Sequence, residues 1–371
     1  MLFRRSWLQR VVFALGVVAC SAPMAAQDLD LYRELVARGS AQPKASTAAL
    51  ARLGRETIER GVAFCTSEDR ATHRLHCSPR ELMAAAMLHA DGADAAFTAS
   101  PDTAVMLIDT ATQLLAPLLP KAQPPVEGRT ELMDQFIPRW YAYVARLCSA
   151  YGYTKRAREV VFDGMSRFEK SADLHVARGV VTERVVELSH PDLKGDLLRG
   201  GFTRKWMRGA RSDPADTAQW LESAATDFRR AIELQPTHIS ANIRLGWIHL
   251  LLDDGRTTRD LTRLLTVVSD SRDRYLALLL RGAVAEGHGR MTDALRDYDE
   301  ARNVGPSYQT ACVASVHARY VTGDRTRAQQ TASECLTLPP ASDGPDPWWA
   351  FRVGLAEPTL GEWLRGVAWQ R

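Results

Sequence analysis

The amino-acid sequence predicts an all-α protein, a right-handed α-solenoid built from helix–turn–helix repeats. Three observations support this fold class. Prolines recur in phase at Pro236, Pro306 and Pro340, and the last two are 34 residues apart. Small residues recur at fixed positions before these prolines, and glycine-containing turns divide the segments between them into pairs. Apolar residues in these segments have helical spacing, so strands are expected to be essentially absent.

The clearest repeat unit is Gly282–Pro306. It has small residues where its two helices would touch, an aromatic residue toward the next unit, and a proline that ends the second helix. These residues are Gly282, Ala294, Tyr298, Ala301 and Pro306, with Gly289-Arg290 at the turn. The same mutual spacing recurs upstream at Ala224, Phe228, Ala231 and Pro236. The pattern therefore continues on the N-terminal side of this unit.

These spacings resemble those of the tetratricopeptide repeat, a 34-residue helix–turn–helix unit. The resemblance covers Ala215–Pro340 and includes further units with turns at Gly255-Arg256 and Gly323-Asp324. It implies a helical scaffold whose first helices line a concave groove for an extended peptide or a partner helix. With the closing Asp-Pro-Trp-Trp and an export signal, the chain looks like secreted bacterial tetratricopeptide proteins of unassigned role. That likeness implies no particular chemistry.

The repeat phase also indicates which side chains would line the groove. They are Ile243, Trp247, Leu250, Leu279, Glu286, Val313, His317 and Tyr320. Trp247 and Tyr320 are the expected anchors, because aromatic side chains dominate interface energetics. Packing of Trp247 against a neighbouring helix remains an alternative.

The first 26 residues are expected to be a targeting segment. Three arginines precede Val11–Ala19, an apolar stretch too short to span a bilayer. Cleavage before Gln27 would remove it. Alternatively, residues 17–20, Val-Val-Ala-Cys, resemble a bacterial lipobox and would leave Cys20 as a lipidated N-terminus. Either outcome predicts export to the periplasm or cell envelope, with membrane contact only through lipidated Cys20.

The charge balance excludes one class of partner. The chain has 47 basic and 44 acidic side chains, and removal of the targeting segment takes away three arginines and no acid, leaving 44 of each. Nucleic-acid binding would need a basic face. We therefore expect no nucleic-acid partner.

The rest of the chain is expected to divide into five regions. These are an N-terminal helical region (27–136), degenerate repeats (137–190), a basic loop insertion (191–213), clear repeats (214–340) and a C-terminal loop with a capping helix (341–371). The insertion carries six basic residues and two interleaved aromatic residues. It could touch an acidic partner or lipid headgroups, although such loops are more often simply solvated.

One cluster in the N-terminal region has the residue types of a metal site. Cys65, His73, His76 and Cys77 could supply two thiolates and two imidazoles to zinc. Their spacing matches no common zinc motif, and an oxidising compartment favours a Cys65–Cys77 disulfide. We therefore expect the disulfide and no metal, with unbridged thiols and zinc as alternatives.

Two further cysteines fall at opposite ends of adjacent predicted helices. Cys312 lies at the start of one helix and Cys335 at the end of its antiparallel partner, so the two would face each other. A second disulfide is predicted here, with separate core cysteines as the alternative. Cys148 is then a small apolar residue on a buried helix face.

No motif in the chain indicates catalysis. A nucleophile elbow, a P-loop, H-E-x-x-H and a dinucleotide fingerprint are all missing from the sequence. We expect no enzymatic activity and no cofactor. The leading hypothesis is an exported scaffold that mediates protein–protein interactions in the bacterial cell envelope, through a protein or peptide partner. The alternatives are a lipid-anchored accessory of an envelope assembly, and a metal-binding or hydrolytic protein built around Cys65–Cys77.

Overall fold

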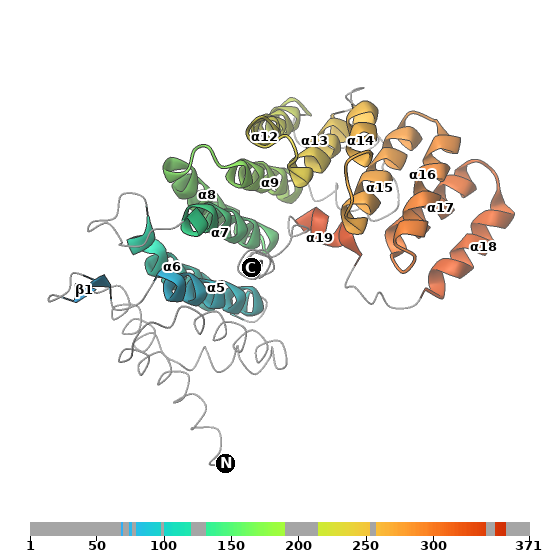
Figure 1. Ribbon diagram of the computed structural model, residues 1–371. Coiled ribbons are helices and arrows are strands. Elements are labelled where there is room, and N and C mark those ends of the chain that lie inside the picture. Colours follow the sequence, from blue (N-terminus) through green and yellow to red (C-terminus); the bar gives the residue numbers. More distant parts are fainter. Residues whose placement is uncertain are drawn as a thin grey trace, which may run out of the picture. The chain divides into compact units, whose positions relative to one another are not determined.

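The computed structural model describes residues 68–69, 74–75, 79–97, 100–119, 131–189, 214–252, 257–338 and 346–353 (Figure 1). Within these ranges nearly every regular element is a helix. The exception is a pair of two-residue strands, β1 (Glu68–Asp69) and β2 (Arg74–Leu75), which are antiparallel with Glu68 opposite Leu75. The all-α fold class predicted from the sequence is therefore confirmed.

The chain forms two compact units, and the boundary between them falls at Trp140 and Tyr141. The described part of the first unit contains a packed pair of helices, α5 (Pro79–Ala96) and α6 (Pro101–Leu115), followed by the short 3-10 helix η2 (Ala116–Leu118). Ser100 precedes α6, and a proline occupies the first turn of this helix. Proline is tolerated there because the first N–H groups of a helix have no helical hydrogen-bond partner. Helix α7 (Glu131–Ala150) runs across the boundary.

The second unit is a series of antiparallel helical hairpins (Figure 1). After α7 its elements are α8 (Thr154–Arg167), α9 (Ala172–Ser189), α12 (Pro214–Leu234), α13 (Ile239–Leu251), α14 (Thr257–Leu265), α15 (Ser271–Gly287), α16 (Met291–Val304), α17 (Gln309–Val321), α18 (Arg325–Leu336) and α19 (Pro347–Val353). The pairs α13–α14, α15–α16 and α17–α18 are tetratricopeptide-like repeats, each packed on the next. Their apolar faces form one continuous core.

Glycines set the turns inside three hairpins. Gly152, Gly289 and Gly323 have φ angles of 87°, 73° and 86°, in the left-handed region that costs other L-residues energy. They lie between α7 and α8, α15 and α16, and α17 and α18. The repeat phase predicted the turns at Gly289 and Gly323.

Close contact between paired helices depends on a second set of glycines. A Cβ atom added at Gly282 of α15 would lie 2.5 Å from the Tyr298 ring of α16, and one at Gly179 of α9 would lie 2.6 Å from the Phe228 ring of α12. In both hairpins the aromatic ring therefore packs directly against the glycine backbone. The predicted small positions Ala294, Ala301 and Ala224 are fully buried.

The pairing of α9 with α12 places the basic insertion inside a repeat. Arg178 and Gly179 of α9 contact Asp227 and Phe228 of α12 as Arg281 and Gly282 of α15 contact Asp297 and Tyr298 of α16. The two hairpins therefore share one Arg-Gly and Asp-aromatic arrangement. Residues 190–213 connect the helices of one hairpin, whereas the sequence suggested that they separate two groups of repeats.

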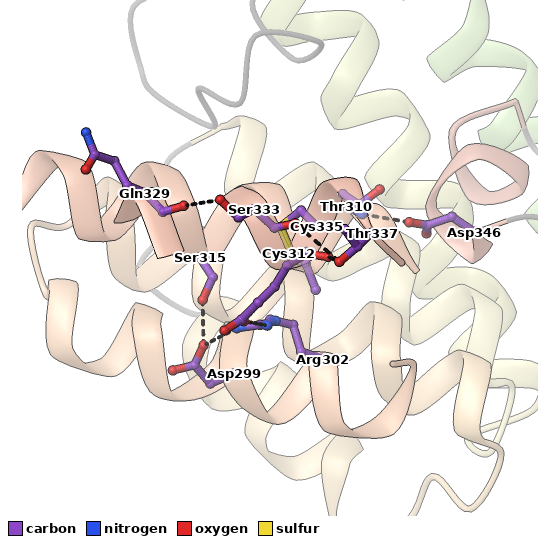
Figure 2. Close-up of a disulfide and its surroundings, with 12 residues drawn as sticks. Asp299, Arg302, Thr310, Cys312, Ser315, Gln329, Ser333, Cys335, Thr337 and Asp346 are labelled. Atoms are coloured by element: carbon purple, nitrogen blue, oxygen red, sulfur yellow. Dashed lines mark hydrogen bonds and ion pairs between the residues drawn. A yellow bond between two sulfur atoms is a disulfide. The ribbon is translucent and has the colours of Figure 1, made fainter. Parts of the chain in front are cut away.

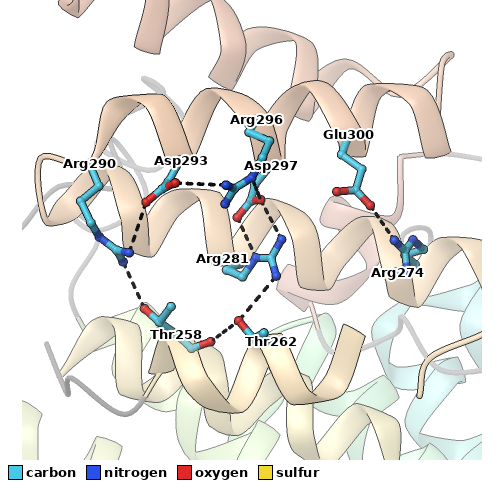
Figure 3. Close-up of polar contacts among 9 residues, drawn as sticks. All are labelled: Thr258, Thr262, Arg274, Arg281, Arg290, Asp293, Arg296, Asp297 and Glu300. Carbon is cyan, nitrogen blue, oxygen red and sulfur yellow. Dashed lines mark hydrogen bonds and ion pairs between the residues drawn. The ribbon is translucent and has the colours of Figure 1, made fainter. Parts of the chain in front are cut away.

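Polar contacts join α14, α15 and α16 on one side of the core (Figure 3). Arg281 donates to both carboxylate oxygens of Asp297, at 2.7 and 2.8 Å, and approaches the Thr262 hydroxyl at 3.5 Å. Arg290 likewise contacts Asp293 and the Thr258 hydroxyl of α14, at 3.4 and 3.3 Å. These arginines connect one hairpin to the preceding one.

A disulfide between Cys312 and Cys335 joins α17 to α18, as predicted (Figure 2). Beside it, Ser315 donates to Asp299 of α16 at 2.6 Å, and Arg319 contacts the same carboxylate at 2.6 Å. The last hairpin is thus linked covalently within itself and by hydrogen bonds to the hairpin before it. Cys148 is buried, as expected.

The contact between the Tyr298 ring and α15 can be tested by adding one methyl group at Gly282. Gly282→Ala should lower the free energy of unfolding by about 1–3 kcal/mol, because the new Cβ overlaps the ring. Gly287→Ala on the same helix is the matched control, since a Cβ there meets nothing within 4 Å. Urea unfolding measures both. Equal midpoints for Gly282→Ala and the wild type would show that the hairpin needs no glycine.

The disulfide can be tested by counting thiols. Unreduced, unfolded wild type and Cys312→Ser/Cys335→Ser should expose the same number of thiols, because the two removed sulfurs are bonded to each other. The variant should also be less stable by about 3 kcal/mol, the chain-entropy value for a loop of this size. Two extra thiols in the wild type would mean that the bridge does not form.

Candidate functional site

The predicted groove residues divide into a covered set and an exposed set. Trp247 of α13 is only 2% exposed, and Ile243, Leu279 and Glu286 are buried. Leu250 and His317 are half-buried. Val313 and Tyr320 of α17 are 50% and 60% exposed. Trp247 therefore packs against a neighbouring helix, the alternative left open by the sequence, whereas Tyr320 is exposed.

The short helix α19 covers Trp247. Trp348 and Phe351, one helical turn apart on α19, meet the Trp247 ring edge-on at centroid distances of 5.6 and 6.4 Å. Arg352 places its guanidinium carbon 5.4 Å from the same ring. Such edge-on aromatic contacts stabilise beyond the burial of apolar area alone. We call residues Asp346–Val353 the C-terminal strap.

The strap begins at an aspartate with three partners. Asp346 accepts the backbone N–H of Trp348 at 3.0 Å, which caps α19, and its other oxygen accepts the backbone N–H of Thr310 at 2.8 Å (Figure 2). The Tyr275 hydroxyl donates to that second oxygen at 3.2 Å, and itself accepts from the Ala311 N–H at 3.1 Å. One carboxylate therefore ties the strap to α15 and to the start of α17.

Two arginines attach the other end of the strap. Arg244 of α13 is buried; it donates to Glu183 of α9 at 2.7 Å and to the Phe351 carbonyl at 2.5 Å. Arg352 of the strap lies 2.6 Å from Glu187 of α9. Burial raises the pKa of Glu183, and the Arg244 charge opposes that shift. Charged contacts thus hold the strap across α9 and α13.

The helical part of the strap differs from the sequence expectation. The capping helix was expected at Leu355–Trp369, after the Asp-Pro-Trp-Trp stretch, and that range lies outside the described part of the chain. Local signals for α19 do exist. Asp346 precedes a proline at the first helical position, and Trp348 and Phe351 have the spacing of one helix face.

A buried carboxylate lies beside the exposed face of α17. Glu286 of α15 accepts a hydrogen bond from the Tyr298 hydroxyl at 2.7 Å and lies 2.8 Å from Nδ1 of His317. Burial, reinforced by Glu286, raises the pKa of Tyr298 well above its usual value. Burial and the neighbouring Asp346 likewise raise the pKa of Tyr275. The Glu286 carboxylate thus orients His317 beside α17.

The α17 face, defined by Val313, His317 and Tyr320, is the exposed remainder of the predicted groove. These residues lie at helical spacing on one side of α17. Arg325 of α18 places its guanidinium carbon 5.8 Å from the centre of the Tyr320 ring. The disulfide and the contacts with Asp299 hold the helix backbone beneath them. The surface is partly apolar, with Val313 and Tyr320 exposed to solvent.

Several predicted features fall outside the described residues. They are the targeting segment, Cys20, the cluster with Cys65 and Cys77, and the basic insertion. Among the residues that the structure does describe, no group of three or more potential metal ligands occurs. No helix in those ranges has the length and apolarity needed to cross a bilayer.

Comparison with known proteins adds little. No protein-family model matches the chain, and no curated protein matches it. Among solved structures, MamA (residues 41 to the end) from Desulfovibrio magneticus RS-1 is 14% identical, with a TM-score of 0.39 over 54% of this chain and 94% of its own. Human IFIT1, in a dimer with PPP-AAAA, is 15% identical, with a TM-score of 0.38 over 79% and 71%. Likenesses at this level carry no ligand or activity across, so the repeat assignment rests on the hairpins themselves.

The raised tyrosine pKa values predict a stability that falls in alkaline solution. Unfolded tyrosine ionises near pH 10, whereas buried Tyr298 stays protonated, so the folded chain binds more protons. The contribution of Tyr298 to the free energy of unfolding is fully present below about pH 10. Above that pH it is lost at about 1.4 kcal/mol per pH unit. Tyr298→Phe should reduce the slope of unfolding free energy against pH by that amount. An unchanged slope would contradict the assignment.

Proposed function

We propose that the protein is an exported, non-enzymatic scaffold that binds a protein or peptide partner in the bacterial cell envelope. The observation that carries the proposal is the α17 face, where Val313 and Tyr320 stay exposed on a disulfide-linked hairpin. Of the equivalent groove positions on α13 and α15, Leu250 is half-buried and the others are buried. The partner would place apolar side chains against Val313 and Tyr320.

Export is supported by the chain's first residues and by the Cys312–Cys335 disulfide. The arginine-led apolar segment before Gln27 has the composition of a secretion signal. A structural disulfide such as Cys312–Cys335 persists mainly in oxidising compartments. Cleavage before Gln27 and lipidation of Cys20 both agree with these features. The lipidated form would act as a membrane-tethered accessory of an envelope assembly.

The proposed contact can be tested once a partner is captured from envelope extract. Tyr320→Ala should weaken its affinity by about 30-fold or more, because truncating an interface hot spot typically costs about 2 kcal/mol or more. Phe162→Ala is the matched control: Phe162 is an exposed aromatic residue, 51% accessible, on α8. Binding is measured by titration calorimetry, with thermal unfolding in parallel.

A charge variant decides between the α17 face and the basic insertion. Arg204, Lys205 and Arg208 are replaced together by alanine, and affinity is compared with that of Tyr320→Ala. After signal removal the chain has equal numbers of basic and acidic side chains, so we expect no long-range attraction to the partner. Added salt should therefore change the affinity little. Loss of binding in the charge variant alone would place the contact on residues 191–213 and overturn the proposal.

A further inference from the structure

The C-terminal strap contacts the solenoid in a way that the repeat helices do not. Each hairpin packs mainly on its neighbours, as expected of stacked repeats. The strap instead crosses several first helices, through Glu187 on α9, Arg244 and Trp247 on α13, Tyr275 on α15 and Thr310 on α17. A bound peptide segment would make contacts of this kind.

The strap helix depends on these contacts for its structure. Alpha19 has seven residues, and isolated helices shorter than about 12–15 residues are marginal in water. The sequence between α18 and the strap contains Pro339, Pro340, Gly344 and Pro345, which do not continue a helix. The strap is therefore joined to the repeats by one non-repetitive segment on its N-terminal side and held by side-chain contacts.

The covered surface has a definite chemistry. Trp247 offers an aromatic face to Trp348 and Phe351, and Glu187 offers a carboxylate to Arg352. At the opposite end, the Thr310 N–H and the Tyr275 hydroxyl both donate toward one carboxylate, which Asp346 supplies. A segment that fits must carry an acid, then two aromatic residues three positions apart, then an arginine.

We propose that the strap is a displaceable internal ligand, and that the face beneath it receives a partner segment of the same chemistry, Asp-x-Trp-x-x-Phe-Arg. This extends the proposed function and rests on it, because Asp346 binds the first turn of α17, the helix that carries the α17 face. Strap release would expose Trp247 and free the Phe351-bound N–H of Arg244 for a partner carbonyl. Partner binding at this face is then controlled by the chain's own C-terminal region.

The direct test uses a fluorescein-labelled peptide with the sequence of residues 345–353, titrated with the full mature protein. Trp348→Ala/Phe351→Ala, which weakens the strap, should bind this peptide at least ten-fold more tightly than the wild type, as measured by fluorescence anisotropy. Trp349→Ala is the matched control, because Trp349 lies on the same helix but is 49% exposed. It should match the wild type. Equal affinity of wild type and folded double variant would overturn the proposal.

Hydrogen exchange on the unmodified protein covers the case in which the double variant fails to fold. If the strap is displaceable, amides of Trp349–Val353 exchange through a local opening, faster than those of Leu278–Leu280 in α15. Exchange of both sets only through global unfolding would make the strap a fixed part of the core and refute the inference. The peptide carries only strap residues and its binding is measured without the envelope partner, so failure of this inference is distinguishable from failure of the α17 contact.

Discussion

The spacing between paired helices is the constraint on which the second unit depends. Tyr298 rests on the backbone of Gly282, and Phe228 rests on that of Gly179, so a single hydrogen atom at each glycine determines how closely the helices approach. Interhelical distance is set by the side chains at the contact. Bidentate pairing of Arg281 with Asp297, next to the glycine contact, then fixes the register. The stacking of successive hairpins, and with it the surface formed by the first helices, follows from this spacing.

That surface is occupied unevenly. On α13 and α15 the chain's own strap supplies aromatic and charged side chains, whereas on α17 Tyr320 remains in solvent. The same helix positions therefore serve internal packing in one part and face outward in another. Under the strap, buried Arg244 of α13 forms an ion pair with Glu183 of α9, and both residues belong to the repeat helices. The repeats thus retain internal ion pairs that do not depend on the strap.

Sequence periodicity predicted the features that are set locally. The turn at Gly289, the small residue at Ala301 and the Cys312–Cys335 bridge all follow from residues within one hairpin. The coverage of Trp247 could not be predicted in this way, because it depends on contacts such as that of Arg244 with Phe351, 107 residues apart. Pairing of α9 with α12 was obscured for a related reason, since residues 190–213 interrupt the 34-residue phase. Burial of a groove position is decided by whatever distant segment packs on it.

The interrupted hairpin also affects the order in which the solenoid assembles. Arg178 and Asp227 are 49 residues apart in sequence, whereas the equivalent Arg281 and Asp297 are 16 apart. Closing a longer loop costs more chain entropy, by about 0.6 kcal/mol for each doubling of length. Folding is faster where contacts are local. The α15–α16 hairpin thus has a kinetic advantage as a nucleus, and the α9–α12 hairpin is expected to close later, against helices that have already formed.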